Sequence, residues 1–142
     1  MSAPFHTKVH VHTIKNEMEN RTMAFANPEN LTKEQLEGRL VEPDPTVPCG
    51  MKLLADGSPL GRRHARLEVF EKRGPGNGGV ITAQFSYSEL VPIKDGDALA
   101  QGDTPVGAGA GEVKVGAADP NAPWVAEVLT IKGKKYASIV AI

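Results

Sequence analysis

Three histidines near the N-terminus have the spacing best suited to metal chemistry. His10 and His12 are two positions apart, so a strand over 7–14 would place both imidazoles on one face, with His6 nearby. Three neutral imidazoles suit zinc. No carboxylate or thiol close in sequence completes a ligand set. We therefore predict a solvated or partner-facing strand, no metal site and no cofactor.

Three aspartates, Asp95, Asp97 and Asp103, are spaced closely enough to suggest calcium binding or a pair of acid–base carboxylates. Asp-Gly is a common turn dipeptide, and the dense oxygen-ligand pattern of a calcium loop is missing. Cys49 lacks a neighbouring basic residue that would activate its thiol. The glycines of 107–112 lack the Lys-Ser/Thr ending of a phosphate loop. We predict turns here and a protein that is not an enzyme.

The basic group at 62–66 is the charged feature best suited to binding. Arginine forms two-pronged contacts with carboxylates, so this group could dock on an acidic protein surface. A solvated loop is the alternative. Nucleic-acid binding is disfavoured because no aromatic side chains are interleaved for base stacking. The group consists of Arg62, Arg63, His64 and Arg66, with Lys72 and Arg73 further on.

The elements that must position these residues are short strands. Glycine and proline interrupt 88–115 too often for a helix, while apolar pairs recur between Gly-Asp turns. Alternating apolar residues predict further strands at 51–54, 66–71, 80–87, 124–129 and 136–142, with a hairpin at Gly133. We predict a mainly β fold, a small β-barrel or β-sandwich, over residues 51–142.

Residues 1–50 read as an extended N-terminal arm with one short helix near 32–37. Thr32 and Gln35 form a capping-box pattern, and Gly38 suits the C-terminal end. Met23 and Phe25 lie in a polar segment that we expect to become ordered on a partner. Three prolines before Gly50 indicate a domain boundary there.

Composition excludes several classes of protein. A formal net charge of −1 disfavours a general nucleic-acid binder, although residues 51–94 carry seven basic and four acidic groups. The single cysteine excludes an internal disulfide. No signal peptide and no apolar segment of membrane-spanning length is visible, so we expect synthesis in a cytoplasm and no membrane contact.

The pattern from Leu90 onward resembles the head-decoration, or cement, proteins of tailed bacteriophages. It consists of Gly-Asp turns, then GAGAGEVKVGAA, then WVAEVLTIKGKKYASIVAI. The resemblance implies a homotrimer on the capsid outer surface of the virion that clamps adjacent major capsid subunits. It implies no catalytic residues. The residues expected to face partners are His10, His12, Met23, Phe25, Arg62, Arg63 and Arg66.

Two alternatives remain open. PIKDGDALAQGDTPV also looks like half of a lipoyl or biotinyl carrier domain, although the hairpin lysines Lys132, Lys134 and Lys135 lack the flanking residues of a modified lysine. The other alternative is a small enzyme whose site forms between subunits.

Overall fold

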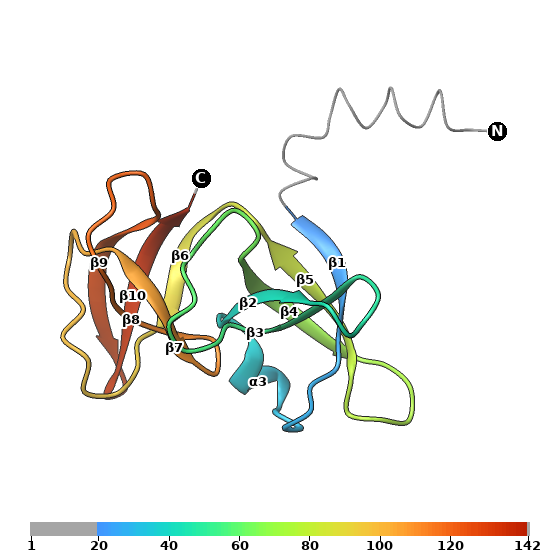
Figure 1. Cartoon of the computed structure of the whole chain (residues 1–142). Coiled ribbons are helices and arrows are strands. Elements are labelled where there is room, and N and C mark those ends of the chain that lie inside the picture. The colour runs from blue at the N-terminus through green and yellow to red at the C-terminus, as the bar shows by residue number, and fades with distance from the viewer. Residues whose placement is uncertain (1–19, 142) are drawn as a thin grey trace.

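The computed structural model describes residues 20–141 and consists mainly of strands, arranged as a barrel beside a second set of sheets (Figure 1). The prediction of a mainly β fold with a small barrel and one short helix is confirmed. The elements in chain order are β1 (Asn20–Phe25), α3 (Lys33–Leu36), β2 (Leu40–Asp44), β3 (Gly50–Leu53), β4 (Ala65–Lys72), β5 (Gly79–Gln84), β6 (Tyr87–Pro92), β7 (Pro105–Gly109), β8 (Glu112–Val115), β9 (Trp124–Ile131) and β10 (Lys134–Ala141).

Five strands close the barrel in the order β1-β3-β2-β4-β5. β1 completes the ring because it pairs antiparallel with β5 on one side and parallel with the start of β3 on the other. Closure leaves a single apolar interior, to which α3 also contributes a side chain. The largest members of this core include Phe25, Leu36, Val41, Met51, Leu67, Phe70 and Ile81.

A second unit follows the barrel. It contains the three-stranded sheet β6-β10-β9 and the two-stranded hairpin β7-β8. Its core joins Leu40 from the barrel strand β2 to residues of the second unit, among them Val91, Ile93, Val113, Val125 and Ile139. Leu40 belongs to this core and Val41 to the barrel core, because consecutive strand residues point to opposite faces. One strand thus supports both units.

The short helix forms where its capping pattern predicts. The Thr32 side chain accepts a hydrogen bond from the backbone N–H of Gln35 at 3.2 Å, and the Gln35 side chain accepts one from the N–H of Thr32 at 2.9 Å. Four helical residues are unstable alone, so packing must hold them. The fully buried Leu36 provides that packing in the barrel core.

The predicted arm over residues 1–50 is wrong for residues 20–50. These residues supply β1, α3 and β2, and the expected boundary at Gly50 is the first residue of β3. Each of the segments is too poor in apolar residues to fold alone. Closure of the barrel buries their few apolar side chains together, which local sequence does not reveal. The predicted strand over 7–14 lies outside the described residues.

The C-terminal hairpin is confirmed. Lys132 and Gly133 have φ angles of 51° and 80° and join β9 to β10, as expected of a two-residue turn with positive φ at both positions. The predicted strand over 80–87 is interrupted, because β5 ends at Gln84 and β6 begins at Tyr87. The chain passes there from the barrel into the second unit.

Candidate binding surfaces

The basic group at 62–66 does not form one patch. Arg62 and Arg63 are exposed in the loop before β4, whereas His64 is buried and the Arg66 side chain is only 13% exposed. A turn causes this division, since the backbone N–H of His64 donates to the carbonyl of Gly61 at 3.2 Å. Of the residues at 62–66, only Arg62 and Arg63 therefore present exposed cationic side chains.

Arg66 connects the barrel to the second unit. Its Nε donates to the carbonyl of Leu90 at 2.9 Å, and a terminal nitrogen donates to Oε1 of Gln84 at 3.0 Å. The same nitrogen lies 2.6 Å from the half-exposed carboxylate of Glu89. The prediction that Arg66 faces a partner is wrong, because its guanidinium is engaged in this internal network.

His64 and Tyr87 form a second polar link between the units. His64 Nδ1 lies 2.5 Å from the carbonyl of Gly61, so Nδ1 carries the proton. Nε2 then accepts a hydrogen bond from the Tyr87 hydroxyl at 2.6 Å. Burial lowers the pKa of His64 and raises the pKa of Tyr87. Both groups therefore remain neutral at physiological pH. We call the network of Arg66, Gln84, His64 and Tyr87 the polar seam.

Met23 and Phe25 are parts of the barrel. Phe25 is only 3% exposed and makes an edge-to-face contact with Phe70, with ring centroids 6.1 Å apart. Met23 is half-buried and packs on the same core. The prediction that these residues face a partner is wrong for Phe25, whose ring is needed inside the barrel. His6, His10 and His12 lie outside the described residues.

The aspartates hold turns, as predicted. Asp97 accepts hydrogen bonds from the backbone N–H of Leu99 at 2.9 Å and of Val115 at 3.0 Å. Asp103 accepts one from Ala100 at 2.8 Å. Within residues 20–141, no group of three or more histidine, cysteine or acidic side chains has an arrangement suited to a metal ion.

Lys134 lies between two carboxylates. Its ammonium is 3.0 Å from Asp95 and 2.9 Å from Glu112. Burial acts to lower the pKa of Lys134, but hydrogen bonds to Glu112 and Asp95 outweigh it and raise the pKa. A lysine held in this way is poorly suited to carry a covalent cofactor, whereas Lys132 and Lys135 in the same hairpin are exposed.

The glycine-rich run 107–112 is a structural turn. Ala110 and Gly111 have φ angles of 51° and 77° and connect β7 to β8. Arg39 donates to the carbonyl of Ala110 at 2.7 Å, and the backbone N–H of Leu40 donates to the carbonyl of Gly111 at 2.9 Å. A Cβ at Gly111 would lie 2.8 Å from the Leu40 carbonyl, so a larger residue would disturb this contact with the barrel.

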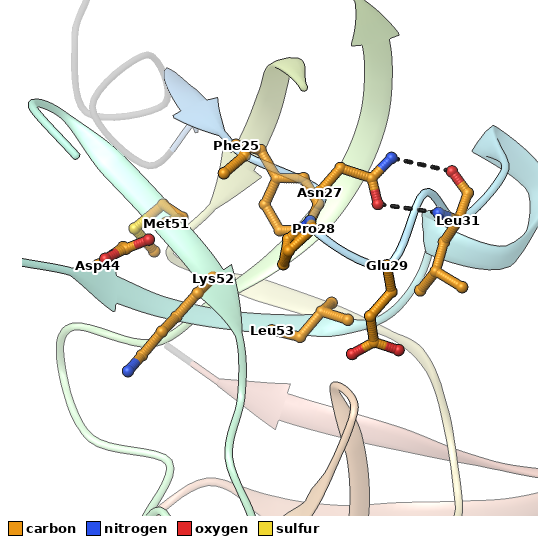
Figure 2. Close-up of a pocket in the computed structure, with 10 residues that line it drawn as sticks. Phe25, Asn27, Pro28, Glu29, Leu31, Asp44, Met51, Lys52 and Leu53 are labelled. Atoms are coloured by element: carbon orange, nitrogen blue, oxygen red, sulfur yellow. Dashed lines mark hydrogen bonds between the residues drawn. The ribbon is translucent and has the colours of Figure 1, made fainter. Parts of the chain in front are cut away.

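An apolar pocket opens where β1 leaves β3, a feature that no sequence motif indicates (Figure 2). Its volume is about 240 Å³, which is smaller than the roughly 300–1,000 Å³ of typical small-molecule sites. The segment after β1 forms one wall and β3 the other. Apolar lining comes from Phe25, Ala26, Pro28, Leu31, Met51 and Leu53, and the charged residues are Glu29, Asp44 and Lys52. We call this site the β3 pocket.

Asn27 holds the outer wall of the β3 pocket in place. Its side chain accepts a hydrogen bond from the N–H of Leu31 and donates to the carbonyl of Leu31, both at 3.0 Å (Figure 2). A second donation reaches the carbonyl of Asn77 at 3.2 Å. These hydrogen bonds to Leu31 and Asn77, none of which involves β3, hold the wall apart from β3.

Apolar side chains are also exposed along β9, an edge strand of the second unit. Trp124 is 49% exposed and Ile131 is 45% exposed. Val115 on β8 and Val69 on β4 are exposed to a similar degree. Exposed tryptophan is characteristic of protein–protein contact sites, where its ring supplies a large area with few rotatable bonds. We call Trp124 and Ile131 the β9 edge.

The sequence matches no protein-family model, no curated protein and no solved structure. Nor does the described part of the chain contain a helix with the length and hydropathy needed to cross a bilayer. The surfaces themselves must therefore support any functional assignment.

Proposed function

We propose that this chain is a non-enzymatic structural protein that binds the outer surface of a phage capsid and clamps neighbouring major capsid subunits. The observation that carries the proposal is the contrast between its polar and apolar side chains. The polar side chains best suited to catalysis or ligand binding instead make the hydrogen bonds of turns and of the polar seam. The tryptophan of the β9 edge, in contrast, is 49% exposed. Polar groups engaged inside the molecule and apolar side chains at its surface are what a protein that functions by binding other proteins requires.

Self-association, as a homotrimer, is part of the proposal. Exposed apolar side chains occur on β4, β8 and β9, on both units of the molecule. One face can then contact another copy while a different face contacts the shell. A weak contact repeated over many copies on a shell gives tight overall binding, because each bound copy raises the effective concentration of its neighbours.

The test is co-sedimentation of the purified protein with capsids of the virus that encodes it, together with the melting temperature of those capsids. We expect binding that raises the melting temperature, and a severalfold loss of binding in Trp124→Ser. Glu127→Ser is the matched control, because Glu127 is exposed on the same strand but presents no apolar side chain. Absence of co-sedimentation by the unaltered protein would refute the proposal.

A further inference from the structure

The β3 pocket borders a strand edge with unused hydrogen-bonding groups. β1 pairs with β3 only at Ala24–Gly50 and Phe25–Met51, and the chain then diverges. Leu53 lies two residues beyond Met51, beside the pocket.

The hydrogen-bond pattern shows which side of β3 the backbone groups of Leu53 face. The N–H of Leu54 donates to Leu40 at 2.9 Å, toward β2. The N–H of Ala24 in β1 donates to the carbonyl of Cys49 at 2.8 Å. Successive residues of a strand direct their N–H and C=O groups to alternate sides, so Leu53 shares the orientation of Cys49 and faces away from β2. Leu53 lies opposite Val41 of β2, at a position of the ladder whose N–H and C=O point away from β2, and outside the strand ladders no backbone hydrogen bond within residues 20–141 involves Leu53.

An extended segment with alternating apolar side chains would complement this site. It could add backbone hydrogen bonds at the β3 edge and insert an apolar side chain between the walls. The pocket volume of about 240 Å³ suits side chains rather than a larger ligand. The charged residues of the pocket are two acids, Glu29 and Asp44, and one base, Lys52. A segment with basic residues is therefore favoured.

We propose that the β3 pocket binds residues 7–14 of the same chain. This segment, TKVHVHTI, alternates as required, with Val9 and Val11 on one face and Lys8, His10 and His12 on the other. Lys15 directly follows the segment, on the face of Val9 and Val11, and provides the positive charge that the acidic side of the pocket favours.

The chain is long enough for this contact. Val11 precedes Asn20 by nine residues, which span roughly 30 Å when extended. β1 has six residues, so its length is roughly 17 Å. The segment can therefore return along β1 to the pocket. Attachment to β1 gives it a high effective concentration there, which favours the chain's own segment over that of another copy.

Thiol crosslinking in the full chain tests the contact. Cys49, the only native cysteine, is exposed and has a φ of 52°, so it is replaced by Asn, which tolerates positive φ. Val11→Cys is then combined with Glu29→Cys at the exposed rim and treated with a short bis-maleimide at low protein concentration. The matched control combines Val11→Cys with Ser88→Cys, an exposed position on β6.

We expect an intramolecular 11–29 link, identified by mass spectrometry, that is severalfold more abundant than the 11–88 link. Val9→Thr, which keeps the side-chain shape but replaces a methyl group with a hydroxyl, should reduce the 11–29 link severalfold, whereas His10→Thr on the opposite face should not. Equal yields for positions 29 and 88, links only between chains, or equal effects of the two threonine variants would overturn the proposal. Capsid binding is a separate measurement, so either proposal can fail alone.

Discussion

The polar seam and the β3 pocket use side chains in opposite ways. In the seam, Arg66 and His64 make hydrogen bonds inside the molecule, although basic residues usually lie in solvent. In the pocket, Leu31 and Leu53 line an opening, although leucine is usually buried. The comparison shows that residue type alone does not distinguish a binding surface from a structural contact.

Replacement of Arg66 should give the largest effect among the seam and loop variants. Arg66→Ala leaves the carbonyl of Leu90 and the amide oxygen of Gln84 without this donor. Loss of a partner costs about 1–3 kcal/mol for each buried group, so for these two groups we expect the free energy of unfolding to fall by about 2–6 kcal/mol. The ion pair with Glu89 adds little because that carboxylate is 50% exposed.

Urea denaturation measures this change. Arg63→Ala is the control, because Arg63 is exposed in the loop just before β4 and should change the free energy of unfolding by less than about 0.5 kcal/mol. Equal effects of the two variants would contradict the structural role of Arg66.

A smaller effect is expected from acidification, through His64. Burial lowers its pKa below the ordinary value of 6.5, so the unfolded chain binds a proton more readily than the folded one. Stability should therefore be fully present above pH 6.5 and decrease as the pH falls from 6.5 toward the folded-state pKa.

Melting temperatures measured between pH 8 and pH 5 test this sign. The variant His64→Gln cannot titrate there and should lose less of its stability over the same interval, whatever its stability at pH 8. The comparison between the two proteins separates His64 from the carboxylates, which also begin to protonate near pH 5. A variant with the same pH dependence as the unaltered chain would exclude His64 as the cause.

The smallest effect on stability is expected at Arg62 and Arg63. Reversing both charges to Glu should change the free energy of unfolding by less than about 0.5 kcal/mol, because both side chains are exposed. Capsid binding should nevertheless weaken, and the remaining binding should depend less on salt. Lys132→Glu with Lys135→Glu makes the same change of charge in the exposed hairpin. Equal capsid binding by both double variants would show that the loop of Arg62 and Arg63 does not contact the capsid.

Local features of this protein were determined by its sequence alone. The capping box of Thr32 and Gln35, the Lys132-Gly133 hairpin and the aspartate turns depend on residues close together in the chain. Their hydrogen bonds and backbone angles follow from residue type and spacing, and so does the mainly β character. These are the predictions that the structure confirms.

Only the tertiary structure decided which segments share a core and which side chains reach solvent. β1 lies between β3 and β5 although the two strands are far from it in sequence, and that closure places Phe25 inside. The same closure opens the β3 pocket, and packing of the second unit against the barrel brings Arg66 to Leu90. The physical reason is that burial and strand pairing depend on contacts between distant residues, whose free energies are not encoded in any one short segment.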